Sequence, residues 1–188
     1  MNTDLKYYIK QFDNFIEKDI CEKTIEEMKK IEFHQHTFYN VETGTNSAVL
    51  GSKELSVSWG EVSTQKLITE KLKNCIKDYI EYINMPWFKS FQAYSIIRFN
   101  KYDENTEMAL HCDHIHSMFD GKRKGIPILS VLGILNNNYE GGEFIMFDNY
   151  KINLKIGDVL IFPSIFLYPH KVKSVNKGTR YSFISWVW

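Results

Sequence analysis

Hydrophobic residues recur at helical spacing in the first half of the chain. In the segment 62–83 the apolar positions fall three or four residues apart, which places their side chains on one face of an α-helix. A weaker repeat of the same kind over 17–31 predicts a second helix. Between them, the segment 34–60 is polar and contains glycines, so we expect strands around a mobile loop there.

From residue 88 onward the pattern changes to short β-prone runs separated by turn residues. The runs lie at 89–101, 108–113, 126–136, 143–147, 150–155, 159–163, 168–175 and 179–188. Strands at this spacing, without helices between them, are typical of a jelly roll, also called a double-stranded β-helix. We expect an α+β fold in one domain over 1–188, with residues 1–87 as mostly helical support and a mobile loop, and residues 88–188 as the jelly-roll core.

Composition narrows the class of protein. The chain has 188 residues, of which 44% are apolar and 15% aromatic, as suits one globular domain. Lys+Arg and Asp+Glu both total 23, a balance that argues against a protein built to coat nucleic acid. Three scattered cysteines imply no disulfide framework, which indicates a reducing compartment. The first ten residues have no apolar signal core and no run approaches ~18 apolar residues, so we expect a cytoplasmic protein without membrane contact.

Three residues have the types and spacing of a metal site. His111 and Asp113 are two apart in a stretch apolar enough to be a strand, so their side chains point the same way and Cys112 points the other way. His170 begins another extended run. Two imidazoles and one carboxylate form the facial triad that holds iron(II) and leaves coordination positions open. The alternative is a surface contact between His111 and Asp113, with His170 in the core.

Arg180 adds a fourth element. Two β-prone runs flank the residues 176–178, which resemble a three-residue hairpin loop with glycine where a positive φ is commonly needed. If Val175 pairs with Thr179, Arg180 shares a face with His170 at about 13 Å along the strand. A guanidinium there can bind the far carboxylate of a short dicarboxylic acid whose near end chelates the metal.

With these residues in place, the chain resembles the iron(II)/2-oxoglutarate-dependent dioxygenases, and within them the prolyl-4-hydroxylase-like branch. The likeness runs from about Phe12 to the C-terminus. Besides the metal motif, it rests on Leu135-Asn136 with Tyr139-x-Gly141-Gly142-Glu143, on Gly157 to Pro163, and on the closing series His170, Val172, Val175, Gly178, Arg180-Tyr181-Ser182 and Trp186.

The chain departs from the branch at three positions. Members usually carry a tyrosine at the position of Met108, where it contacts 2-oxoglutarate, and Tyr94 and Tyr102 are the two candidates to supply that hydroxyl here. Relatives also tend to carry aromatic residues where this chain has Gly133 and Ile134.

The resemblance implies an enzyme that binds Fe(II) through His111, Asp113 and His170. It implies 2-oxoglutarate held by Arg180 as co-substrate, O₂ as oxidant, and ascorbate as a candidate reductant. Conversion of 2-oxoglutarate to succinate and CO₂ would accompany hydroxylation of a substrate C–H bond. Halogenating relatives replace the carboxylate by a small residue, so Asp113 favours hydroxylation.

The resemblance points to a prolyl residue of a protein or peptide as substrate, with 34–60 and 114–125 as candidate flaps over the site. A free amino acid or small metabolite is the nearest alternative. Nucleic-acid repair relatives carry R-x-N-x-T-x-R in the final strand, and the window 180–186 lacks the Asn, the Thr and the second Arg. From a different class, a jelly-roll sensor would bind a metal or dicarboxylate without turnover. His114 and His116 are further candidates for substrate contact, and the oligomeric state stays open.

Overall fold

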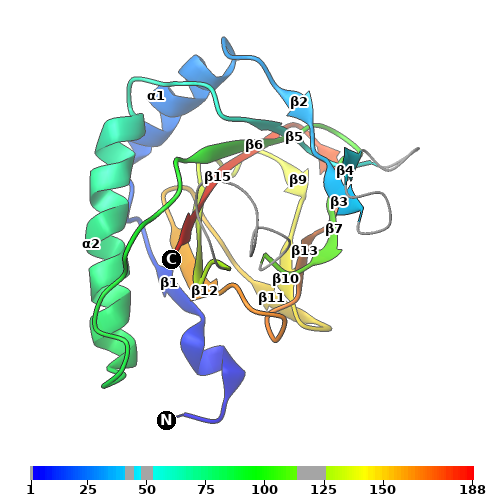
Figure 1. The fold of residues 1–188 in the computed structure, drawn as a ribbon. Helices are drawn as coiled ribbons and strands as arrows, with labels where there is room; N and C mark the ends of the chain where they lie inside the picture. Colours follow the sequence, from blue (N-terminus) through cyan, green and yellow to red (C-terminus); the bar gives the residue numbers. More distant parts are fainter. Residues whose placement is uncertain (1, 41–44, 48–52, 114–125) are drawn as a thin grey trace.

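The computed structural model describes residues 2–40, 45–47, 53–113 and 126–188. Two β-sheets face each other, and two α-helices cover the outside of the larger sheet (Figure 1). The candidate flap 114–125, with His114 and His116, lies outside the described residues. The helical elements are the 3₁₀ helix Leu5–Tyr8, α1 (Lys18–Met28) and α2 (Gln65–Ile83). The strands are β1 (Lys10–Phe12), β2 (His34–Gln35), β3 (Phe38–Asn40), β4 (Thr45–Ser47), β5 (Ser56–Ser58), β6 (Arg98–Tyr102), β7 (Met108–His111), β8 (Leu129–Ile134), β9 (Glu140–Gly141), β10 (Phe144–Met146), β11 (Tyr150–Ile152), β12 (Val159–Pro163), β13 (His170–Val172), β14 (Val175–Lys177) and β15 (Arg180–Val187).

The larger sheet has seven strands in the order β1-β12-β8-β15-β6-β5-β2, and the smaller has four in the order β11-β10-β13-β7. Their paired neighbours run antiparallel, and β9 with β14 and β3 with β4 form two further short pairs. The α+β class and the jelly-roll core predicted from the strand spacing are confirmed. Among the described residues, no helix combines the length and the apolar character needed to cross a membrane.

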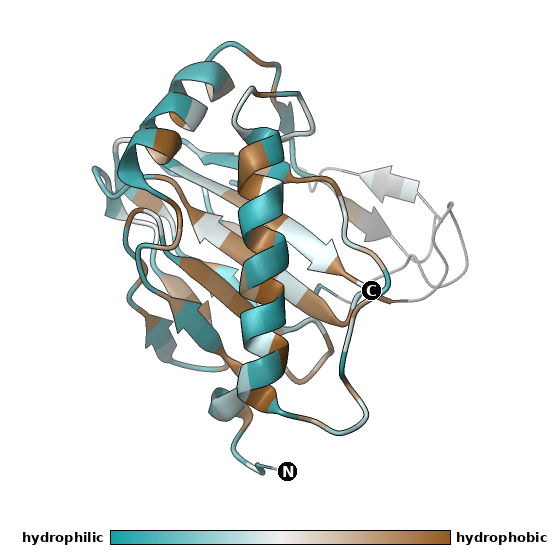
Figure 2. Cartoon of the chain, turned by 90° about the vertical axis from the view of Figure 1, so that its left-hand side faces the viewer, coloured by the Kyte–Doolittle hydropathy of each residue, from teal (hydrophilic) through white to brown (hydrophobic). Residues whose placement is uncertain are grey.

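The central strands of the larger sheet contribute to two separate cores because alternate side chains point to opposite faces. On β15, Phe183 and Val187 pack toward the helices, whereas Arg180 and Ser182 face the space between the sheets. The face of α2 that packs on the larger sheet is the apolar stripe predicted from the sequence, and it includes Ile68, Leu72, Ile76, Ile80 and Ile83. Figure 2 shows α2 lying across the strands, with apolar positions along the helix.

Gly133, one of the departures from the family pattern, is explained by packing on the helix side. It lies directly opposite Phe183 on the neighbouring strand β15. A Cβ atom at residue 133 would come within 2.0 Å of the Phe183 ring, so an aromatic side chain has no room there. The aromatic ring is supplied from the opposite strand instead. Ile134, the other departure, points into the core between the two sheets.

The predicted hairpin around residues 176–178 is wrong. Gly178 does adopt a positive φ of 79°, but β14 pairs with β9, and β15 pairs with β6 and β8. The turn therefore carries the chain from one side of the barrel into the larger sheet. The physical reason is that β15 is buried along most of its length, and buried backbone N–H and C=O groups need hydrogen-bond partners at both edges of the strand.

In the segment 34–60, where strands around a loop were expected, the structure has β2, β3, β4 and β5, and β1 is a strand that the sequence did not predict. One further expectation needs correction. The extended run 89–101 becomes a strand only at β6, with an isolated bridge between Tyr94 and Val187 before it. Whether such a segment pairs as a strand depends on the sheet that it joins rather than on its own alternation.

Candidate metal and co-substrate site

The three predicted metal ligands come together at one end of the barrel. His111 on β7 and His170 on β13 are cross-strand partners in the smaller sheet, and Asp113 follows β7 by two residues. One ligand atom from each of the three lies within 4.8 Å of the others. Cys112 turns away, with its Sγ directed to the carbonyl oxygen of Phe166. The alternation argument from the sequence therefore describes the geometry at this point.

Hydrogen bonds to the backbone hold both imidazoles in the form that a metal needs. Nδ1 of His111 lies 2.8 Å from the carbonyl oxygen of Ala109, and Nδ1 of His170 lies 3.1 Å from that of Tyr168. A carbonyl oxygen only accepts, so each Nδ1 donates its proton to the backbone, and Nε2 is the ring nitrogen left to face a metal. These Nε2 atoms face Asp113, at 3.4 Å from His111 to Oδ1 and 3.8 Å from His170 to Oδ2.

The electrostatics suit the same ligand set. Burial lowers the pKa of His170 to about 4, so its ring is neutral at physiological pH. Burial by itself would raise the pKa of Asp113, but His170, His111 and the Ser130 hydroxyl outweigh it and hold that pKa well below its usual range. Metal ions bind the deprotonated forms of these groups. Two imidazoles and a carboxylate fit iron(II), which such triads hold with open positions.

Ser130 supports the carboxylate from the larger sheet. It lies on β8, fully buried, and its hydroxyl donates to Asp113 Oδ2 at 2.5 Å while sharing a hydrogen bond of 2.8 Å with Ser164. This bond joins the ligand that follows β7 to the opposite sheet. It keeps the carboxylate oriented toward the two histidines.

We expect Ser130→Ala to lower the affinity for Mn(II), an inert substitute for Fe(II), by about 10- to 100-fold, the usual cost of losing a partner that orients a ligand. The measurement is a metal titration of the purified protein. Ser185→Ala is the matched control, because Ser185 is equally buried on β15 but its hydroxyl bonds to Ser95 on the helix side. Equal affinities for the Ser130 variant and the unmodified protein would contradict the supporting role.

Arg180 lies between the sheets and is only 1% exposed. Its guanidinium carbon stacks 4.8 Å from the centre of the Tyr102 ring, and Nη1 donates to the Ser182 hydroxyl at 3.0 Å. Nε is buried, and no atom among the described residues accepts a hydrogen bond from it. A buried guanidinium with an unused donor is suited to bind a carboxylate.

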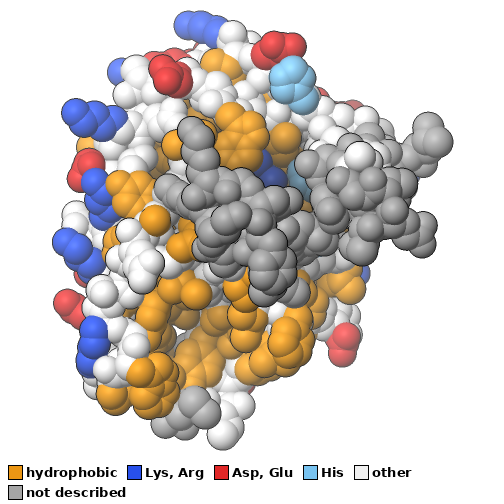
Figure 3. All heavy atoms as spheres, viewed as in Figure 1, with side chains coloured by type: hydrophobic (Ala, Val, Ile, Leu, Met, Phe, Trp, Pro, Cys, Tyr) orange, Lys and Arg blue, Asp and Glu red, His pale blue; other side chains and the backbone are white. Residues whose placement is uncertain are grey.

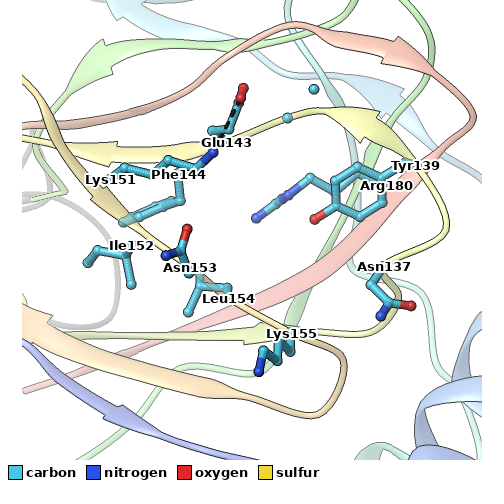
Figure 4. Close-up of a pocket in the computed structure, with 12 residues that line it drawn as sticks. Asn137, Tyr139, Glu143, Phe144, Lys151, Ile152, Asn153, Leu154, Lys155 and Arg180 are labelled. Atoms are coloured by element: carbon cyan, nitrogen blue, oxygen red, sulfur yellow. Dashed lines mark ion pairs between the residues drawn. The ribbon is translucent and has the colours of Figure 1, made fainter.

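A pocket of about 240 Å³ opens onto Arg180. Figure 4 shows the arginine side by side with Tyr139 at one side of this pocket, with Lys155 and Asn153 on other parts of its wall. Phe144 also lines the pocket, and its ring stacks on His170 with centroids 5.4 Å apart. Phe144 therefore connects the two parts of the site, the metal ligands on one side and the guanidinium on the other.

The two tyrosine candidates lie in different places. Tyr102 is buried directly against Arg180, its cross-strand partner. Tyr94 packs on the helix side, where the Lys73 ammonium lies 5.5 Å from its ring centre, so it is separated from Arg180 by the sheet. Met108 is buried in the core between the sheets. Of the two tyrosines named from the sequence, only Tyr102 is placed beside the guanidinium.

Sequence reasoning missed three polar residues near the metal ligands. Ser130 interrupts an apolar run in β8, and Arg98 interrupts the apolar run 96–99 at the start of β6. An isolated polar residue at an inward position of a buried strand was the signal available for both. His36 lies between β2 and β3 and is only 8% exposed. Nothing in the polar sequence around it indicated burial.

Comparisons with known proteins agree with this geometry. The profile of the 2OG-Fe(II) oxygenase superfamily matches residues 97–188, which hold all three metal-ligand candidates and Arg180. A PKHD-type hydroxylase from Idiomarina loihiensis is 28% identical over 74% of this chain and 59% of its own length. Another from Xylella fastidiosa is 34% identical over 48% of this chain and 43% of its own length. The chain thus spans about half the length of the curated relatives it matches.

Solved structures show the same fold at low identity. A prolyl-4-hydroxylase from Pseudomonas putida superposes with a TM-score of 0.65 at 18% identity, covering 96% of this chain and 91% of its own. A prolyl hydroxylase from Trichoplax adhaerens, solved with a peptide fragment of hypoxia inducible factor, has a TM-score of 0.72 at 19% identity, covering 97% and 84%. The two-histidine, one-carboxylate site, the buried arginine and the profile match lead to one conclusion: residues 97–188 of this chain form a domain of the 2OG-Fe(II) oxygenase superfamily.

Proposed function

We propose that the chain is an Fe(II)- and 2-oxoglutarate-dependent hydroxylase that acts on a prolyl residue of a peptide or protein. The observation that carries the proposal is the pairing of two sites between the same sheets. His111, Asp113 and His170 bring their ligand atoms within 4.8 Å of one another, and Arg180 holds a buried guanidinium in the same barrel. A dicarboxylic acid that chelates a metal at one end and binds a guanidinium at the other fits both.

Each residue has a role that follows from its contacts. His111 and His170 offer Nε2 because their Nδ1 protons are bound by backbone carbonyls. Asp113 supplies the anionic ligand, and Ser130 orients it. Arg180 takes the far carboxylate of 2-oxoglutarate, with the Tyr102 ring stacked under its guanidinium. When bound, Fe(II) and 2-oxoglutarate supply the activation of O₂ that C–H hydroxylation requires.

Apolar residues between the sheets limit access of water. Phe144, Phe162 and Met146 are buried around His170, with the Phe162 ring centre 5.0 Å from that of the histidine. A dry surrounding strengthens the interaction of the ligands and the guanidinium with a bound anion. It also protects the reacting carbon from side reactions with solvent.

The prolyl substrate is the finer part of the proposal. It is supported by the names of the relatives and by a structural neighbour described in complex with a peptide. A free amino acid or small metabolite is the second candidate, because Met108 replaces a tyrosine typical of the prolyl-hydroxylase branch. A reducing compartment such as the cytoplasm belongs to the proposal, since Cys21, Cys75 and Cys112 are free thiols.

The decisive experiment measures succinate released by the purified protein in the presence of Fe(II), 2-oxoglutarate and O₂. We expect a panel of proline-containing peptides to include one that accelerates succinate release and gains one oxygen atom by mass spectrometry. Stimulation by free amino acids alone would move the enzyme to the small-molecule class. Metal and 2-oxoglutarate binding without any succinate would instead identify a non-catalytic sensor.

A further inference from the structure

Arg98 lies on the inner face of the larger sheet, near the metal ligands. It begins β6 opposite Ile184, and its guanidinium carbon lies 5.0 Å from the ring of Trp186, the diagonal neighbour on β15. Trp186 is in turn the cross-strand partner of Ser130, which hydrogen-bonds Asp113. Arg98 and Ser130 lie two strand spacings apart and are offset by two residues, about 12 Å in all, so the long arginine side chain reaches a molecule held beside the metal ligands.

Arg98 has no carboxylate partner within the described ranges. Its Nε donates to the Asn100 side chain at 3.1 Å, and the ion pairs found among these residues do not include it. Its side chain is half-buried, and the Asp113 carboxylate is near enough to oppose the lowering of the Arg98 pKa by burial. A partly desolvated guanidinium that stacks on an indole has its edge donors available for a planar anion.

Two further polar nitrogens lie close to Arg98. Nε1 of Trp186 is buried without a hydrogen-bond partner in the part of the chain that the structure describes, and Nδ1 of His36, also buried, lies 3.8 Å from the Glu54 carboxylate. Burial, together with the charges of Arg98 and His111, lowers the pKa of His36 to about 3, so the His36 ring is neutral. His36 therefore lies within electrostatic reach of Arg98 and of His111. Figure 3 shows basic and histidine side chains between apolar ones near the centre of one face, whereas most charged side chains lie at its edges.

We propose that Arg98 binds a carboxylate of the substrate, so that the preferred substrate is acidic close to the hydroxylated carbon. This inference rests on the proposed function and specifies its substrate class. The carboxylate belongs either to an acidic side chain next to the target residue in a peptide or to a free α-carboxyl group. In both cases the guanidinium binds it through two parallel hydrogen bonds.

The co-substrate does not need Arg98. Arg98 and Tyr102 are four residues apart on β6, about 13 Å of strand, and Tyr102 is the residue stacked against Arg180. The two arginines therefore occupy opposite ends of the inner face. Arg180 is placed for the far carboxylate of 2-oxoglutarate, and Arg98 for an anion that arrives at the metal-bearing end.

Two pairs of probes separate the sources of the carboxylate. One pair is N-acetyl-L-proline and N-acetyl-L-prolinamide, and the other is a capped pentapeptide with Glu or Gln beside a central proline. Binding to the full chain loaded with Mn(II) and 2-oxoglutarate is followed by tryptophan fluorescence and by calorimetry, so no turnover is required. We expect the carboxylate member of one pair to bind about 10- to 100-fold more tightly than its amide, as a charge-assisted hydrogen bond provides. The pair that shows the difference identifies the source.

Variants test whether Arg98 is responsible. Arg98→Gln should remove the preference for the carboxylate, and Arg98→Lys should keep only part of it because lysine lacks the bidentate fork. Lys101→Gln is the matched control, since it removes a positive charge from the same strand but from the helix side, where Lys101 pairs with Asp103 at 3.0 Å. Affinities for Mn(II) and 2-oxoglutarate should stay unchanged in all three variants.

Three results would overturn the inference. The first is that neither probe pair shows a preference for the carboxylate, or that no probe binds at all. The second is that the preference persists in Arg98→Gln. The third is that Arg98→Gln loses affinity for 2-oxoglutarate. Failure of the unmodified protein to bind Mn(II) and 2-oxoglutarate would contradict the proposed function instead. Because probe binding and co-substrate binding are measured separately, the two failures are distinguishable.

Discussion

Asp113→Ala is expected to abolish turnover and to weaken binding of Fe(II) or Mn(II) severely. The carboxylate is the only anionic member of the three-ligand group and lies 3.4 Å and 3.8 Å from the Nε2 atoms of His111 and His170. Without it, two imidazoles remain, and a site of two nitrogen donors does not hold a divalent cation in facial geometry. Metal titration and succinate release measure the two consequences. His111→Ala should give the same result.

Cys112→Ala is the matched control for this prediction. Cys112 lies between the two ligands in sequence, but its Sγ points to the Phe166 carbonyl rather than to the metal ligands. Its substitution should leave metal affinity and turnover near those of the unmodified protein. Undiminished metal binding in the double variant His111→Ala/Asp113→Ala would show that other residues hold the metal, and the site assignment would be withdrawn.

Arg180→Ala is expected to raise the apparent Michaelis constant for 2-oxoglutarate by roughly 30- to several-thousand-fold, the equivalent of about 2–5 kcal/mol for removing one partner of a buried charged pair. The guanidinium is buried, and its Nε donates to no described residue, so a bound carboxylate would be its natural partner. Metal affinity should change little. Arg180→Lys should recover only part of the loss, because lysine cannot form two parallel hydrogen bonds.

Steady-state kinetics with varied 2-oxoglutarate check this prediction, together with thermal unfolding to verify that the variants are folded. Lys155→Gln serves as control, since it removes a positive charge from the wall of the same pocket without touching the buried guanidinium. If Arg180→Ala is folded and keeps its dependence on 2-oxoglutarate, another basic residue binds the far carboxylate.

The local patterns of the chain were sufficient to predict which three residues come together as candidate metal ligands. His111 and Asp113 share a side of the chain because alternation along a strand is a property of the backbone itself, independent of what surrounds it. The apolar stripe of α2 follows in the same way from the helical repeat. Such features depend on neighbours a few residues away, and the sequence lists those neighbours directly.

The placement of Arg180 shows where local reasoning ends. The sequence predicted that this arginine shares a strand face with His170, and the prediction is wrong because the hairpin does not form. The two residues lie in different sheets, and the guanidinium reaches the site across the space between them. Which strands pair is decided by burial of both faces of β15, a property of the assembled sheets.

The residues around the metal ligands depended on the tertiary structure altogether. Ser130 touches Asp113, Arg98 stacks on Trp186, and His36 becomes buried only after strands distant in the sequence have come together. Within one strand or helix, the sequence determined which side chains share a face, because backbone geometry repeats over a few residues. Between elements, only the tertiary structure decided which faces meet, because that choice comes from burying apolar surface over the whole chain.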